Sequence, residues 1–145
     1  MKLLVCTDGS KHSQKALEKA AKIAGGCNAT EVAIIHVYEA HDIFIGEGAS
    51  ISQTEHMREL EEQRKKDLKK ILINAVRFME AKNIRASAIF KEGHPAEIIT
   101  KVAEEGGFDL VIMGSRGLGG LKKLLLGSVS GTVVHESSVS VLTVK

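Results

Sequence analysis

Aromatic side chains are scarce in this sequence, which has one Tyr, four Phe and no Trp among 145 residues. A chain of this length can still bury one sizeable core. Hydrophobic residues make up 43% of the chain, but aromatic residues only 3%, so Val, Ile, Leu and Ala must fill most of that core. Such a palette is typical of parallel strands covered by helices. We therefore expect a single domain over residues 1–145.

An excess of charge of one sign and long apolar runs are also lacking. The 20 basic and 18 acidic residues leave a formal net charge of +2. That balance gives no field strong enough to favour a nucleic acid or a membrane surface as partner. Eighteen apolar residues never follow one another, and the apolar run that begins the chain is too short for a signal peptide. The sequence thus predicts a soluble cytoplasmic protein, with neither nucleic acid nor membrane among its partners.

The cysteine and histidine patterns disfavour the common redox and metal motifs. Cys6 and Cys27 lack the CxxC spacing, so we expect two buried thiols rather than a disulfide or a metal site. The six His residues include no HxH, HxxxH or HExxH pattern. The sequence predicts no metal centre built from protein ligands.

Short apolar runs and longer amphipathic stretches alternate along the chain. Five strands are predicted, at residues 3–7, 30–38, 84–90, 109–113 and 139–144. Four helices are predicted between them, from the cap Ser10 to Gly25-Gly26, over 54–82, from Pro95 to Gly106-Gly107, and over 128–136. Apolar residues recur at helical spacing from Met57 to Met79 and predict a stripe of core contacts. Residues 41–52 indicate a surface loop.

This alternation indicates an α/β fold with a parallel sheet, right-handed crossovers and helices on both faces. Such sheets bind ligands outside the carboxyl ends of their strands, at the point where the winding direction reverses. Asp8, Val37 and Gly114 stand at predicted strand ends. We expect the functional site there.

A glycine-rich segment follows the fourth predicted strand and covers residues 114–131. Gly114, Gly117 and Gly127 leave the backbone free to approach an anion closely. The helix predicted from Ser128 begins with N–H groups that have no partner within the helix. This layout is typical of a phosphate cradle and indicates a nucleotide as ligand.

Three better known glycine motifs do not match. No glycine precedes Lys-Ser or Lys-Thr, as a P-loop requires. The first predicted strand is followed by Asp8-Gly9-Ser10 rather than by the GxGxxG of a dinucleotide site. The centre of residues 127–131 is Val129, so the nucleophile of a GxSxG hydrolase elbow is missing. The sequence therefore disfavours an NAD site and acyl transfer.

What the segment does match is the spacing Gly-x2-Gly-x9-Gly-Ser, filled by Gly114, Gly117, Gly127 and Ser128. In this motif the chain resembles the ATP-binding branch of the universal stress protein family. The resemblance covers the whole length of the chain. Four further landmarks carry it, in order: Leu-Val-Cys-Thr-Asp-Gly-Ser near the start, His36-Val37, Gly93-His94-Pro95-Ala96, and Asp109 to Gly117.

The resemblance implies a three-layer α/β/α, Rossmann-like sandwich with five parallel strands in the order 3-2-1-4-5, which brings Asp8 beside Gly114. It implies ATP or AMP as ligand, with Mg²⁺ or Mn²⁺ held mainly by the phosphates. Thr7, Asp8 and Val37 are expected to frame the base and ribose, and Met113 to pack on the adenine. The residues expected around the phosphates are Gly114, Arg116, Gly117, Gly127, Ser128, Val129 and Ser130.

The same resemblance implies that nucleotide occupancy serves as a regulatory or sensing signal in the stress response. Hydrolysis is expected to be slow or absent, because the chain offers Arg116 but no P-loop lysine and no evident carboxylate for the attacking water. The alternative is an ATPase or another nucleotide-dependent enzyme of the adenine nucleotide hydrolase-like group, with a substrate pocket supplied by residues 41–52. A structural partner protein without a ligand is disfavoured by the complete glycine and serine set.

Two positions depart from the family pattern, since Cys6 and Ser140 stand where proline is common. The last strand commonly pairs with its mate in this family, so we expect a homodimer through Val141 to Val144. Gly119-Gly120 and Lys122-Lys123 are expected to form a flexible loop and a solvated face, outside the core of the site.

Overall fold

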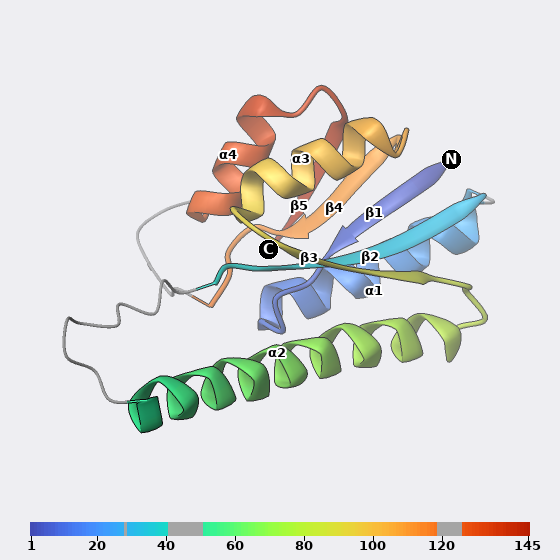
Figure 1. The fold of residues 1–145 in the computed structure, drawn as a ribbon. Coiled ribbons are helices and arrows are strands. Elements are labelled where there is room, and N and C mark those ends of the chain that lie inside the picture. Colours follow the sequence, from blue (N-terminus) through green and yellow to red (C-terminus); the bar gives the residue numbers. More distant parts are fainter. Residues whose placement is uncertain (28, 41–50, 119–125) are drawn as a thin grey trace.

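The computed structural model describes residues 1–27, 29–40, 51–118 and 126–145. Strands and helices alternate along this part of the chain (Figure 1). The elements are β1 (Lys2–Cys6), α1 (Lys11–Gly26), β2 (Glu31–Tyr38), α2 (Ile51–Glu80), β3 (Ser87–Glu92), α3 (Pro95–Glu105), β4 (Leu110–Gly114), α4 (Ser128–Glu136) and β5 (Ser140–Val144).

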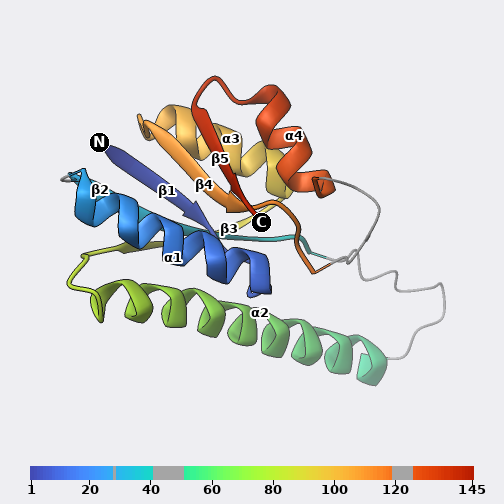
Figure 2. The ribbon, with the colours of Figure 1, turned by 180° about the vertical axis from the view of Figure 1, so that it is seen from behind.

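These strands form one parallel sheet in the order β3-β2-β1-β4-β5. Helices α1 and α2 cover one face of the sheet, and α3 and α4 cover the other (Figures 1 and 2). The predicted α/β class, the three layers and the strand order are confirmed. Because the chain leaves β1 toward β2 on one side and later returns to β4 on the other, the switch point lies between β1 and β4.

Aliphatic side chains fill the layer between the sheet and the helices α1 and α2. Leu3, Val5 and Ile34 point into this layer and are fully buried. Alanines on one face of α1 let that helix approach the sheet closely, and α2 adds larger side chains. The helix residues buried here are Ala16, Leu17, Ala20, Ala21, Ala24, Leu72, Ala75 and Met79.

A second core lies between the sheet and the helices α3 and α4. Successive side chains of a strand point to opposite faces, so Leu4 and Cys6 face this layer while Val5 faces the other. Ile99 of α3 and Val133 of α4 close it from outside. The sheet is therefore covered on both faces, as the Val, Ile, Leu and Ala composition predicts.

The apolar stripe predicted from Met57 to Met79 is only partly buried. Leu72 and Met79 lie in the core, whereas Met57 and Leu60 keep 43% and 52% of their surface exposed. Figures 1 and 2 show that the first turns of α2 reach past the strands, so the sheet does not cover them. The prediction of core contact is wrong for these two residues.

Three smaller predictions need correction. Ser52 belongs to α2 rather than to a loop, while residues 41–50 of the predicted loop lie outside the described residues. β3 begins at Ser87 instead of residue 84, since the chain first turns through Asn83, whose φ is 60°. Cys6 is buried as expected, but Cys27 is exposed, because it caps the carboxyl end of α1. Both cysteines are free.

The described helices include none that is both long enough and apolar enough to cross a lipid bilayer.

Candidate functional site

A cleft of about 400 Å³ opens at the carboxyl ends of β1, β2 and β4. Its walls come from the turn after β1, the end of β2, the segment after β4 and the first turn of α4. The structure brings together in this cleft all the residues that the sequence singles out for a nucleotide: Thr7, Asp8, Val37, Met113, Gly114, Arg116, Gly117, Gly127, Ser128, Val129 and Ser130.

The turn after β1 presents a carboxylate to the cleft. The Ser10 N–H donates to Asp8 Oδ1 over 2.9 Å, so one carboxylate oxygen forms the turn that leads into α1. The Thr7 N–H donates to the Ile35 carbonyl over 3.0 Å and extends the pairing of β1 with β2. Asp8 is therefore both a turn residue and a cleft residue.

The other oxygen of Asp8 lies against the segment that follows β4. A Cβ added at Gly117 would stand 2.6 Å from Asp8 Oδ2, so a larger residue there would force the carboxylate or the loop to shift. Gly114 is needed for a similar reason, since its Cβ would stand 2.8 Å from the His12 backbone carbonyl carbon at the start of α1. These two glycines thus serve close packing within the protein, which is a different requirement from the close approach of an anion expected from the sequence.

A hydrogen-bonded neck joins the end of β4 to the start of α4. The Ser115 carbonyl accepts the Gly127 N–H at 2.8 Å and the Ser130 hydroxyl at 2.9 Å. The same hydroxyl lies 3.1 Å from the Gly127 carbonyl. Ser130 is 3% exposed, and its single hydroxyl proton is directed at backbone carbonyls.

The first turn of α4 offers backbone donors to the cleft. The first bond of its helical pattern runs from the Gly131 N–H to the Gly127 carbonyl over 2.8 Å. The N–H groups of Ser128, Val129 and Ser130 precede that bond, and Gly127 supplies no side-chain cap. The amino end of a helix attracts anions, because these free donors add to its dipole.

Few side chains of the cleft carry charge. Among the described residues that line it, Asp8 is the one carboxylate and Arg116 the one cation. The Arg116 side chain is half-buried and makes no ion pair within the described chain. The two charges lie on segments that approach each other at the contact between Asp8 and Gly117.

The structure adds cleft residues that the sequence reasoning missed. Most of them are apolar, and three of them belong to β2 and α3. The pattern could have identified Ile35, which precedes Val37 by two and so shares its face of β2, and Pro95, which begins α3 within a family landmark. The added residues are Cys6, Ser13, Ile35, Pro95, Ile99, Leu118 and Leu126.

The environment of Cys6 suppresses its ionisation. Burial, followed by the negative charge of Asp8, raises the pKa of the Cys6 thiol to about 12. The residue is therefore a neutral, weakly polar part of the cleft wall at physiological pH.

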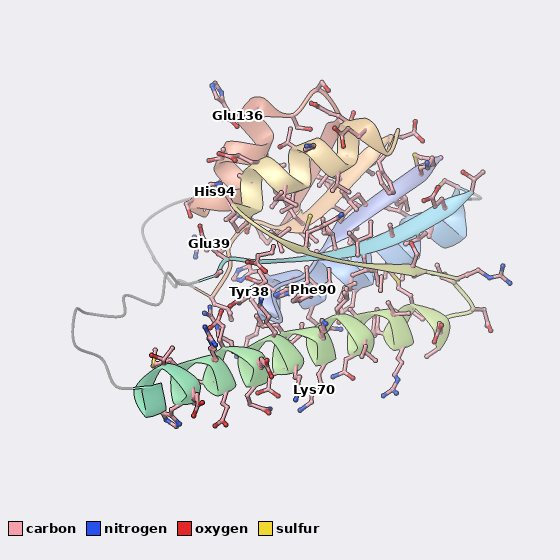
Figure 3. All side chains as sticks on the ribbon, in the orientation of Figure 1. Tyr38, Glu39, Lys70, Phe90, His94 and Glu136 are labelled. Atoms are coloured by element: carbon pink, nitrogen blue, oxygen red, sulfur yellow. The ribbon has the colours of Figure 1, made fainter. Side chains whose placement is uncertain are left out.

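His36 contacts Thr7, the residue that follows β1 and lines the cleft. Its Nδ1 lies 2.8 Å from the Thr7 carbonyl, and because a carbonyl only accepts, Nδ1 carries the proton. The ring stacks on Phe90 at a centroid distance of 5.8 Å, and Phe90 stacks in turn near Tyr38 above α2 (Figure 3). Burial lowers the pKa of His36, an effect partly offset by the bond to Thr7 and the charge of Asp8.

Two further predictions concern residues outside the described part of the chain, the flexible loop at Gly119-Gly120 and the solvated face at Lys122-Lys123. Over the part of the chain that is described, no three His, Cys, Asp or Glu side chains gather as metal ligands.

Comparison with known proteins matches the whole chain to one family. The family model described as Universal stress protein family matches residues 1–145. Universal stress protein YxiE of Bacillus subtilis is 38% identical over 146 residues, covering 99% of this chain and 98% of its own. Universal stress protein MJ0577 of Methanocaldococcus jannaschii is 34% identical over 153 residues, covering 99% of this chain and 94% of its own.

Solved structures agree with this match. The structure of MJ0577 superposes with a TM-score of 0.77 at 33% identity and covers 99% of this chain and 94% of its own. A universal stress protein solved in complex with cAMP superposes with a TM-score of 0.72 at 26% identity and covers 100% of this chain and 97% of its own.

Proposed function

This chain belongs to the universal stress protein family, and we propose that its cleft binds an adenine nucleotide, ATP or AMP. One observation carries the proposal. Residues from segments more than a hundred positions apart, expected at strand ends, in a glycine-serine spacing and from the family resemblance, all line one cleft at the switch point of the sheet. A volume of about 400 Å³ falls in the usual range for small-ligand sites. The relative in complex with cAMP supports the same class of ligand.

The cleft divides into two chemically different parts. The base and ribose belong near Thr7, Asp8, Val37 and Met113, where the wall is largely apolar and one carboxylate can accept from a sugar hydroxyl. The apolar residues Ile35 and Ile99 enlarge this part.

The phosphates belong at the amino end of α4. The free N–H groups of Ser128, Val129 and Ser130 donate there, together with the exposed hydroxyl of Ser128 and the guanidinium of Arg116. The hydroxyl of Ser130 instead donates to the Ser115 carbonyl, so this residue offers only its backbone N–H to the phosphates. Mg²⁺ or Mn²⁺ would be held mainly by the phosphates, as the cleft has one carboxylate among its described residues.

The role proposed for the bound nucleotide is a regulatory or sensing signal, with slow or absent hydrolysis. Phosphoryl transfer needs charge neutralisation and a positioned water. Asp8, the one described carboxylate of the cleft, already accepts from Ser10 and lies against Gly117. This arrangement suits binding better than activation of a water, and no observation favours the alternative of an efficient enzyme.

Two further parts of the proposal concern assembly and place of action. β5 lies at one edge of the sheet, its Val141 to Val144 are partly exposed, and none of these residues is charged. Such an edge favours pairing with a second copy into a homodimer.

We place the protein in the cytoplasm, where its two free thiols remain reduced.

Calorimetric titration with ATP, AMP and cAMP tests the proposal. We expect ATP or AMP to bind with one site per chain, and Ser128→Ala to weaken binding about tenfold, because a hydroxyl bond to a charged phosphate is lost. The matched control is Ser138→Ala, which removes a hydroxyl bonded to Glu104 on the surface, away from the cleft. Absence of binding of all three nucleotides at millimolar concentration would refute the proposed function.

A further inference from the structure

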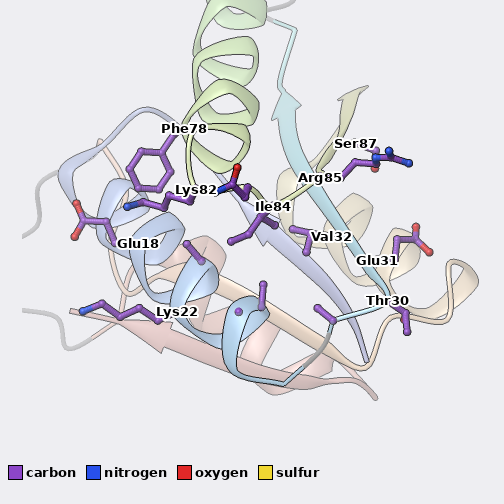
Figure 4. A pocket seen from close by; sticks show the side chains of 15 residues that line it. Glu18, Lys22, Thr30, Glu31, Val32, Phe78, Lys82, Ile84, Arg85 and Ser87 are labelled. Atoms are coloured by element: carbon purple, nitrogen blue, oxygen red, sulfur yellow. The ribbon is translucent and has the colours of Figure 1, made fainter.

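A second hollow lies at the amino ends of β2 and β3, whereas the cleft lies at the carboxyl ends of the strands. Its volume is about 1010 Å³, and it shares no lining residue with the cleft. The ends of α1 and α2, the start of β2 and the approach to β3 surround it (Figure 4). Nothing in the nucleotide proposal uses this hollow.

The hollow exists because two neighbouring strands begin at different levels. β2 pairs with β1 from Glu31 onward, but its pairing with β3 begins only at Ala33 and Ser87. Residues 84–86 therefore approach the sheet without extending it. The start of β2 therefore has no strand beside it on the β3 side, and the hollow lies between residues 84–86 and the end of α1.

The floor of the hollow is apolar. Ala21 and Ala24 from α1 and Val32 from β2 form its base, and Phe78 and Ile84 rise beside it. Small alanine side chains leave room between the two helix ends, which larger residues would fill. A ligand with an apolar body would bury apolar surface here, which favours binding.

Among its described residues, the rim of the hollow carries three cations and two carboxylates. Lys22, Lys82 and Arg85 make no ion pair within the described chain. Of the two rim carboxylates, Glu31 is paired with Lys2 at 3.0 Å, and Glu18 remains. The Lys82 ammonium lies 4.9 Å from the centre of the Phe78 ring, so a positive charge stands directly over an apolar wall.

A simpler role for these cations would be to neutralise the carboxyl ends of α1 and α2. Backbone donors already serve those ends, however. The Ile23 carbonyl accepts the Cys27 N–H at 3.0 Å, and the Met79 carbonyl accepts the N–H groups of Lys82 and Ile84 at 2.9 and 3.1 Å. The rim cations are thus not needed as hydrogen-bond donors to these two carbonyls.

From this combination we infer that the hollow binds small amphipathic anions, with an aromatic or alkyl body on the alanine floor and a carboxylate or sulfonate at the cationic rim. This site is separate from the nucleotide cleft and does not depend on the proposed function. It is the apolar floor together with the excess of positive charge on the rim that selects such a ligand over a free phosphate, which would gain nothing from the floor.

Anilinonaphthalene sulfonate is a suitable probe, because its fluorescence rises on an apolar surface and it carries one negative charge. We expect saturable binding to the folded full-length chain, unchanged by an excess of AMP. Decanoate should displace the dye, whereas decyltrimethylammonium of the same chain length should not. Dye that AMP displaces, or no saturable binding at millimolar protein, would contradict the inference.

Two pairs of variants locate the binding. Lys22→Glu should weaken dye affinity about fivefold, and Lys19→Glu, an exposed lysine of the same helix outside the hollow, should leave it unchanged. Gly25 lines the hollow and has nothing within 4 Å of an added Cβ, so Gly25→Phe should obstruct binding without disturbing the core. Gly26→Phe is the control, since Gly26 has the same open space outside the lining. Equal affinities within both pairs would overturn the assignment.

Discussion

The hydroxyl of Ser130 donates to the carbonyl oxygen of Ser115 across 2.9 Å, and this bond ties the first turn of α4 to the end of β4. The Gly127 N–H reaches the same carbonyl at 2.8 Å. Together the two bonds hold the donors of the α4 amino end at a fixed place beside the cleft.

Replacing Ser130 by Ala removes the buried hydroxyl bond, while the Gly127 N–H still serves the Ser115 carbonyl. We expect the free energy of unfolding to fall by about 1 kcal/mol, the usual net value of such a bond. Nucleotide affinity should fall as well, because the donors of α4 lose their fixed place. Urea unfolding and calorimetry measure the two effects. Ser128→Ala is the comparison, since it should lower affinity with unchanged stability; a Ser130→Ala protein of full stability would show that the neck is unimportant.

Replacing Gly117 by Ala places a Cβ 2.6 Å from Asp8 Oδ2 and must push the carboxylate or the loop aside. We expect a lower melting temperature in the absence of any ligand. Gly127→Ala is the matched control, because its Cβ would meet no atom closer than 3.4 Å. Differential scanning calorimetry of both variants decides the matter, and equal melting temperatures would count against the packing role given to Gly117.

Acidification should destabilise the protein through His36. Burial lowers its pKa in the folded state below the ordinary 6.5, so as the pH falls through 6.5 the unfolded chain gains a proton that the folded chain does not. Stability from this residue is present above pH 6.5 and is lost between 6.5 and the lowered pKa. Urea unfolding from pH 8 to pH 5 should show the loss, and His36→Gln should reduce it. An unaltered pH profile in His36→Gln would remove His36 as the cause.

The two halves of α2 should respond differently to substitution. Leu72→Ala should cost about 2–5 kcal/mol, since the side chain is 4% exposed and leaves a cavity. Leu60→Ala should change stability by less than about 0.5 kcal/mol, because 52% of the residue is exposed. Denaturant midpoints at constant slope give both numbers. A large loss in Leu60→Ala would mean that something covers this residue in solution.

Sequence periodicity predicted the fold well because both signals it uses are strong here. Buried parallel strands appear as short runs of Val, Ile and Leu, and α3 is marked at both ends by Pro95 and Gly106-Gly107. The pattern did not predict how far the sheet extends. Met57 and Leu60 continue the spacing of Leu72 and Met79, so only the position of the strand ends shows that they lie uncovered.

Part of the cleft lining was predictable from a local spacing and part from the positions of strand ends, whereas the supporting contacts were not. The gap from Gly114 to Ser128 is a property of the sequence alone. By contrast, the bond from Ser130 to Ser115 and the approach of Gly117 to Asp8 depend on how loops meet in space. Ile99 reaches the cleft wall from a helix whose pattern gives it only a core role.

Amide chemical-shift mapping on titration with AMP tests the central claim most directly. We predict that the largest changes fall on Asp8, Gly117 and the residues of the first turn of α4, Ser128 to Ser130. Val32 and Ser87, at the amino ends of β2 and β3, should stay unchanged. Changes confined to the amino ends of β2 and β3, or none at saturating AMP and ATP, would contradict the placement of a nucleotide in the cleft.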